Sequence, residues 1–330
     1  MTLFELDTLA PGTKGTYTQP VMAQPDGSML SMTVLATIGE QAGPTLVVLA
    51  GVHGDEYEGI RTVQLLFEKI KPSELRGRLI MVPVCNVPAF FASQRNSPID
   101  GLNLARVFPG DPKGTVTQRI AHILTEKFIA RADFLIDLHS SAGANVMPTM
   151  IGYYYGDSPE AKASQAAALV FGTDVVWGHP YDPTATGRSI SAAIDLGIPW
   201  LYTESLGARS PRPEDIEAYT NGVLNVMRHM GMLEGTVEAK TPKYHLVGSG
   251  NTDMSVSVNN SGYFLPAVEL LERVSKGQLV GRVLNLAGET IEELYAHVDG
   301  RVGLLHTRPT VHAGEGVILL SGELSDIEAA

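Results

Sequence analysis

Two hydrophobic patterns alternate along the first two thirds of the chain. Continuous apolar runs typical of buried strands occupy residues 45–51, 78–84, 132–139 and 198–204. Between them, apolar side chains recur every three or four residues, the spacing of an amphipathic helix. The helices predicted in this way are 56–70, 117–132 and 213–231. Strands that alternate with helices indicate an α/β fold with a largely parallel central sheet.

The pattern changes beyond about residue 238. Short strands and glycine-centred turns dominate, and TIEELY (290–295) is the one brief stretch with a helical pattern. VSKGQLVGRV (274–283) and VHAGEGVILL (311–320) both carry Val-x-x-Gly followed by an apolar strand, which resembles the pseudo-symmetric hybrid barrel of biotinyl and lipoyl domains. We therefore predict two domains, 1–238 and 239–330, of which the second is small and all β.

Composition and charge narrow the class of protein. Apolar residues make up 44% and charged residues 18%, the balance of a globular protein with a large core. A formal net charge of −12 argues against a nucleic-acid partner, because phosphate binding needs clustered Lys and Arg. A single cysteine, the absence of a leader-like N-terminus and the absence of a long apolar run predict a cytoplasmic protein without a membrane partner. Self-association into a homo-oligomer stays open.

The segment GVHGDEYEG (51–59) carries the first candidate chemistry. Asp55 and Glu58 fit a capping box at the start of the following helix. This interpretation leaves His53 and Glu56 unexplained, at the carboxyl edge of a parallel strand where α/β sheets place their ligands. Catalytic zinc often takes two histidines and one glutamate as ligands. His53 and Glu56 are therefore candidate metal ligands, although H-x-x-E alone is common by chance.

A third ligand is available at another strand end. His139 closes the apolar strand 132–139, and small residues follow it. Asp137 lies two residues earlier, on the same face of that strand, so it could orient a ligating histidine. Two strand ends with such side chains favour a metal site over an isolated structural histidine.

Four motifs then resemble one family. GVHGDEYEG, NLARVFPG, DLHSSAG and YTESLG stand in the order found in the succinylglutamate desuccinylase/aspartoacylase family of the zinc carboxypeptidase superfamily, over roughly residues 40–235. The resemblance implies a zinc-carboxypeptidase-like mixed sheet flanked by helices, with the β domain beside the active site. It also implies one zinc ion per chain and hydrolysis of the amide bond of a small N-acyl amino acid or related compound.

The resemblance also implies roles for individual residues. The zinc ligands would be His53, Glu56 and His139. Glu204 in YTESLG would be the general base, and Arg95 would polarise the scissile carbonyl. Arg106 would grip a substrate carboxylate, a bidentate task suited to a guanidinium group.

One position departs from the family pattern. Members commonly have Asn immediately before the second arginine, whereas this chain has Ala105. Half of the carboxylate clamp is therefore missing, and Asn103 or Arg188 are the candidates to compensate as substrate-binding residues. We expect weak activity on N-acetyl-aspartate and N-succinyl-glutamate, and a preference for a bulkier or less acidic N-acyl compound.

Two other functions stay open. One is a carboxypeptidase-like hydrolase of short peptides, which needs an open cleft. The other is a metal-binding or small-molecule-binding protein with lapsed catalysis, an interpretation that Ala105 permits and Glu204 opposes, since a pure binding site has no use for a base. The sequence leaves undecided the acyl group, the amine, the presence of a free substrate carboxylate and the physiological metal.

Overall fold

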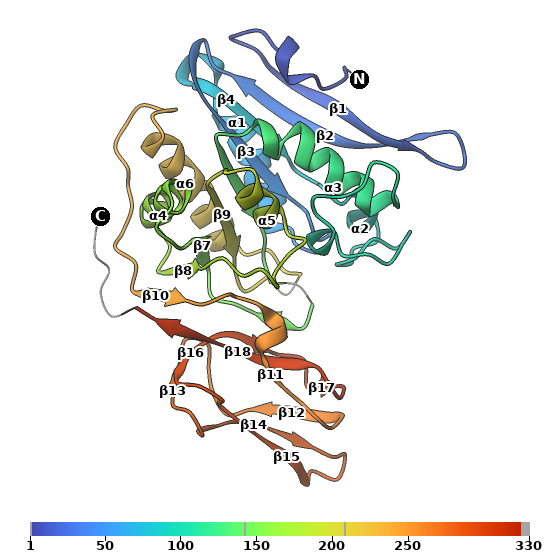
Figure 1. Cartoon of the computed structure of the whole chain (residues 1–330), viewed down its shortest axis with the longest axis vertical. Coiled ribbons are helices and arrows are strands. Elements are labelled where there is room, and N and C mark those ends of the chain that lie inside the picture. Colours follow the sequence, from blue (N-terminus) through green and yellow to red (C-terminus); the bar gives the residue numbers. More distant parts are fainter. Residues whose placement is uncertain (1, 142, 208, 325–330) are drawn as a thin grey trace.

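The computed structural model describes residues 2–141, 143–207 and 209–324. Its central element is a mixed sheet whose middle strands, β3 (Gln41–Ala50), β5 (Phe134–Leu138) and β9 (Trp200–Glu204), are parallel neighbours. The α/β architecture with a mostly parallel, mixed sheet predicted from the sequence is thereby confirmed (Figure 1).

The remaining strands extend this sheet on both sides. On one side, β4 (Arg76–Val82) is parallel to β3, and the hairpin β1–β2 (Lys14–Ala23, Met29–Ile38) adds antiparallel strands. On the other side, β7 (Met150–Tyr154) pairs antiparallel with β9, and β8 (Val175–His179) pairs parallel with β7. The three parallel strands that carry the candidate site therefore lie in the interior of the sheet.

Helices cover both faces of the sheet. Their bounds are α1 Glu58–Lys69, α2 Val87–Phe91, α3 Val116–Lys127, α4 Pro159–Phe171, α5 Ser189–Asp195 and α6 Pro213–His229. Val47 and Leu49 of β3 pack in one core cluster with α3 and α5, whereas Leu46 and Val48 pack in another with α1, α4 and α6. Burial on both faces explains why this strand is a continuous apolar run. In the described part of the chain, no helix is both long and apolar enough to cross a bilayer.

The C-terminal part is built of antiparallel strands at the end of the molecule opposite the β1–β2 hairpin (Figure 1). β10 (Tyr244–Val247) joins the central sheet beside β8, and β18 (Gly316–Glu323) and β16 (Gly300–His306) continue it. The remaining C-terminal strands are β11 Val256–Ser257, β12 Gly262–Pro266, β13 Arg273–Val274, β14 Leu279–Leu284, β15 Thr290–Tyr295 and β17 Thr310–Val311. β6 (Asn145–Val146), from the first part of the chain, pairs with β16. Strands β15, β14, β12 and β17 form a second sheet. Because hydrogen bonding runs from β8 through β10 into β18, the boundary at residue 238 stays a prediction.

The two similar sequence segments adopt similar local structures. Each begins at a short strand, turns at a glycine, and continues into a longer strand: β13 to β14 and β17 to β18. The turn glycines Gly277 and Gly314 have φ of 84° and 90°, the left-handed region that glycine adopts without strain. The predicted small all-β region at the C-terminal end is therefore confirmed.

The segment 290–295 is a correction. Its sequence predicts a short helix, but it forms β15, which pairs antiparallel with β14. Leu294 points into the β core while Ile291 and Tyr295 are exposed, and such side chains suit a half-buried strand surface. Pairing with β14 therefore overrides the weak local helical pattern.

Candidate active site

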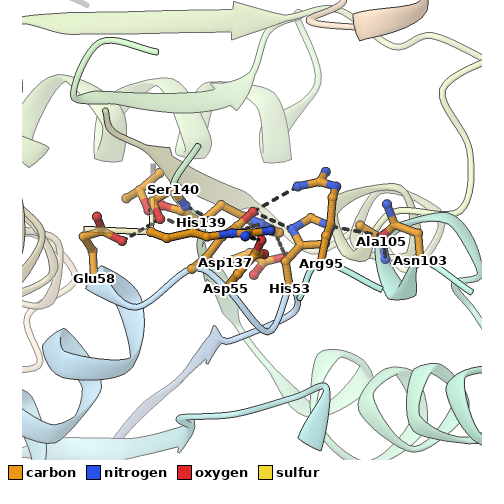
Figure 2. A network of polar contacts seen from close by, with 12 residues as sticks. His53, Asp55, Glu58, Arg95, Asn103, Ala105, Asp137, His139 and Ser140 are labelled. Carbon is orange, nitrogen blue, oxygen red and sulfur yellow. Dashed lines mark hydrogen bonds and ion pairs between the residues drawn. The ribbon is translucent and has the colours of Figure 1, made fainter. Parts of the chain in front are cut away.

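Side chains from three adjacent strand ends meet at one edge of the central sheet. His53 and Glu56 follow β3, His139 follows β5, and Glu204 is the last residue of β9. Since these strands are parallel neighbours, their carboxyl ends lie together, where α/β sheets bind ligands. Figure 2 shows His53 and His139 side by side, with Arg95, Asn103 and Asp137 around them.

Two imidazoles face one buried carboxylate. The Nδ1 atom of His53 lies 2.7 Å from Oε1 of Glu56, and the Nδ1 atom of His139 lies 2.9 Å from Oε2 of the same carboxylate. The ligand atoms of these three residues all lie within 4.8 Å of one another. The predicted ligand set is thus brought together, with the Nδ1 atom of each ring facing the Glu56 carboxylate.

The outer nitrogen of each ring has an oxygen partner. Nε2 of His53 lies 3.0 Å from Oδ1 of Asn103, and Nε2 of His139 lies 3.1 Å from Oδ2 of Asp137. An acceptor at Nε2 fixes the proton there and turns the Nδ1 lone pair inward, the usual arrangement of metal-ligating histidines. Two such nitrogens and one carboxylate suit a zinc ion.

The electrostatics of the three residues also suit a cation. Against the effect of burial, His53 and His139 lower the pKa of Glu56, so this carboxylate stays ionised. Burial lowers the pKa of His53, which favours the neutral imidazole that binds metals. Against burial, Asp137 and Glu56 raise the pKa of His139, so two carboxylates stabilise positive charge at this point.

The predicted capping box is wrong. The helix α1 begins at Glu58, and its N-cap residue, Tyr57, makes no side-chain cap. Asp55 instead pairs through Oδ2 with Nε of Arg209 at 3.0 Å, and Ser140 donates to Oε2 of Glu58 at 2.5 Å. Both carboxylates therefore bind the loops that follow β9 and β5. They fix the neighbouring strand ends against the His53 loop.

Glu204 lies in the same pocket with an unsatisfied oxygen. Its Oε2 atom is buried and has no hydrogen-bond partner in the described part of the chain. Burial and the nearby Glu56 carboxylate raise the pKa of Glu204 to about 8. A carboxyl group with such a pKa can take up and release a proton near neutral pH.

The pocket above these residues has a volume of about 750 Å³, including its open mouth. Arg95, Arg106 and Arg188 all line it, so the structure brings the three predicted arginines together. Nη1 of Arg95 lies 3.1 Å from Oε1 of Glu56. Nη1 of Arg106 donates to the carbonyl of Ala105 at 2.8 Å, and Nη1 of Arg188 donates to the carbonyl of Ala185 at 3.2 Å.

The side-chain oxygen of Asn103 makes contacts within the protein, and substrate binding by this residue stays a prediction. Its Oδ1 atom accepts from the backbone N–H of Ala105 at 2.9 Å, in addition to its contact with His53. Asn103 therefore lies behind the candidate metal ligand His53, while Ala105 itself lines the pocket with 7% of its surface exposed.

Sequence reasoning missed several pocket residues. Tyr202 lies two residues before Glu204 on the same strand face, a signal that the alternation within β9 contains. Met147, Leu304 and Leu319 form an apolar wall, and Ser189 donates to Asp137. No local pattern links these positions, because long-range pairing of β16 and β18 brings two of them to the site. Within the motif at 137–143, Ala142 lies outside the described residues.

Comparisons with known proteins found a matching family model and a similar protein. The model of the succinylglutamate desuccinylase/aspartoacylase catalytic domain matches residues 42–230. The chain is 29% identical over 301 residues to N-alpha-acetyl-L-2,4-diaminobutyric acid deacetylase from Halomonas elongata. The aligned residues cover 89% of this chain and 85% of that protein.

Solved structures are similar over nearly the whole chain. The product-bound ectoine utilization protein EutE (DoeB) from Ruegeria pomeroyi has a TM-score of 0.86 and 28% identity, and the match covers 96% of this chain and 98% of that chain. A succinylglutamate desuccinylase from Silicibacter sp. has the same TM-score, identity and coverage.

Proposed function

Because the chain belongs to the succinylglutamate desuccinylase/aspartoacylase family, we propose that it is a zinc-dependent hydrolase that removes the acyl group from a small N-acyl amino acid. The family predicted from the four motifs is confirmed, and so is the broad activity, deacylation of a small N-acyl amino acid or related compound. Zinc dependence, the role of each residue and the substrate itself are the proposed part.

Nδ1 of His53, the carboxylate of Glu56 and Nδ1 of His139 would hold the zinc ion. When bound there, zinc supplies Lewis acidity and lowers the pKa of water. Asn103 and Asp137 keep the two rings oriented through their Nε2 atoms. Ser189 also donates to Asp137, so the carboxylate that holds His139 is itself fixed.

Glu204 moves the proton in the proposed reaction. Its carboxylate takes a proton from the attacking water and returns it to the nitrogen of the leaving amine. Burial, which raises the pKa of Glu204 to about 8, helps it hold that proton between the two steps. Arg95, which reaches Glu56, would donate to the developing oxyanion of the scissile carbonyl.

The pocket indicates a small substrate. Arg106 and Arg188 supply positive charge for a carboxylate, and the C-terminal strands supply Leu304 and Leu319 as a wall. A wall at this place leaves little room for a peptide, so the carboxypeptidase-like alternative fits less well. The Halomonas elongata relative is named for an acetylated diamino acid, and we propose a short acyl group on an amino acid for this chain as well.

The single observation that carries the proposal is the Glu56 carboxylate shared by two oriented histidines, with Glu204 in the same pocket. We expect Glu204→Gln to retain the fold and bound zinc and to lose about 10²–10⁴-fold in kcat, the usual contribution of a general acid–base. Steady-state kinetics on N-acetyl amino acids, with zinc content measured on the same samples, tests this. An active Glu204→Gln enzyme would move the base elsewhere.

A further inference from the structure

Tyr202 reaches across the sheet to a buried histidine. It stands between Asp137 of β5 and Gly152 of β7 in the sheet register. A Cβ atom at Gly152 would lie 2.1 Å from Cε1 of Tyr202, so the absence of a side chain there lets the ring lie over β7. The hydroxyl thereby reaches Nε2 of His179 on β8, at 2.8 Å.

The environment of His179 decides the direction of that hydrogen bond. Its Nδ1 atom lies 2.8 Å from the carbonyl oxygen of Gly248, which can only accept, so Nδ1 carries a proton and donates it. The ring is 6% exposed, and burial lowers the pKa of His179 to about 4, so the ring is neutral. Nε2 therefore has a lone pair and accepts the proton of the Tyr202 hydroxyl.

This arrangement fixes the polarity of a pocket side chain. A tyrosine hydroxyl has one proton, and Tyr202 donates it to the hydrogen bond with His179. The oxygen of Tyr202 therefore has only lone pairs left for a ligand in the pocket that Tyr202 lines. We propose that Tyr202 is a specificity-determining residue that accepts a hydrogen bond from an N–H group of the substrate. The proposal rests on the proposed deacylase function and adds a selection rule to it.

The selection rule separates substrates by what they present at Tyr202. An N–H donor can come from the scissile amide or from a second, free amino group of the amine part, and both satisfy the oxygen. A carboxylate brings no proton and would face lone pairs, which makes its burial there unfavourable. Substrates with a nitrogen donor should thus be preferred over dicarboxylic ones.

The test compares wild type with Tyr202→Phe on three acetyl compounds. N-alpha-acetyl-2,4-diaminobutyrate has both donors, N-acetyl-2-aminobutyrate lacks the free amine, and 2-acetoxy-4-aminobutyrate lacks the amide N–H. We expect Tyr202→Phe to lose roughly 10- to 100-fold in kcat/KM on the first compound when the donor is the charged amino group, and about 2- to 10-fold when it is the neutral amide N–H. The loss should vanish on whichever analogue lacks the donor that Tyr202 binds. An equal loss on all three, or no loss on the first, would overturn the proposal.

Two further variants sharpen the test. Tyr154→Phe removes a hydroxyl from a tyrosine that stacks on Trp200, with ring centroids 6.1 Å apart, and should leave all three values unchanged. His179→Phe releases the Tyr202 proton and should raise the ratio of activity on N-acetyl-aspartate to activity on N-alpha-acetyl-2,4-diaminobutyrate. If the His179→Phe protein does not fold, the comparison of Tyr202→Phe with wild type still tests the proposal. Hydrolysis of none of these compounds by the zinc-loaded wild type would instead contradict the proposed function.

Discussion

At the residue scale, one amide oxygen links two parts of the site. Oδ1 of Asn103 contacts Nε2 of His53 and also accepts from the backbone of Ala105, beside Arg106. The candidate metal ligand His53 and the loop that carries Arg106 are therefore held by the same atom. The sequence predicted Asn103 as a candidate substrate-binding residue, which stays a prediction. Its contact with His53 depends on how the loop folds back over β3, which no local pattern encodes.

Loss of that oxygen should weaken metal binding. We predict that Asn103→Ala lowers zinc affinity by about 10- to 100-fold, the usual effect of removing the partner of a ligating histidine. Asn103→Asp, which keeps an acceptor, should retain most of the affinity. Competition with a chromophoric chelator measures this, and Asn96→Ala, an exposed change in the same loop, is the control. Equal affinity in Asn103→Ala and wild type would remove Asn103 from the site.

Ala105, like Tyr202, is a position where a single side chain should change substrate specificity. It lines the pocket next to Arg106, so Ala105→Asn would add a hydrogen-bond donor for a substrate carboxylate. Such a bond contributes about 1.5 kcal/mol, which corresponds to roughly a tenfold higher kcat/KM on N-acetyl-aspartate and N-succinyl-glutamate. A kinetic panel of N-acyl amino acids measures the change. If wild type already prefers these acidic compounds and Ala105→Asn changes nothing, this interpretation of the pocket is wrong.

At the scale of elements, tertiary contacts constrain the turns after the strands as much as they constrain the strands. The strands themselves were predictable, because residues 46–50 of β3 and all of β5 are buried, and these stretches are apolar apart from Asp137. The partners of Asp55 and Glu58 were not predictable, because these carboxylates bind Arg209 and Ser140 from loops distant in sequence instead of forming a capping box. Local rules thus predicted where elements lie, whereas tertiary contacts decided what their terminal polar side chains bind.

Gly207, in the turn after Glu204, shows this constraint. Its φ is 58°, and a Cβ atom there would lie 1.8 Å from the carbonyl oxygen of Ser141. We predict that Gly207→Ala displaces the loops that follow β9 and β5, and lowers both the melting temperature and kcat. Gly197→Ala is the matched control: φ is 69° and nothing lies within 4 Å of the new Cβ. It should cost only the backbone strain, about 1–2 kcal/mol, and similar losses in both variants would contradict the role of the close contact.

At the scale of the whole molecule, the pocket has a local positive charge and an apolar wall that the overall composition does not indicate. The net charge is −12, yet Arg95, Arg106 and Arg188 converge on one pocket. Leu304 and Leu319 reach that pocket because β10, β18 and β16 extend the central sheet. The change in pattern beyond residue 238 predicted a β region, but strand register over such distances is set by folding of the complete chain.

The central claim is a zinc ion held by His53, Glu56 and His139, and metal content of the purified protein tests it most directly. Elemental analysis should find about one zinc per chain in wild type and in His312→Ala, which alters an exposed histidine outside the site. His53→Ala and His139→Ala should each lose most of that zinc while circular dichroism shows an intact fold, because two ligands remain where catalytic zinc usually has three. Undiminished zinc in the folded His53→Ala and His139→Ala proteins would contradict the site proposed here.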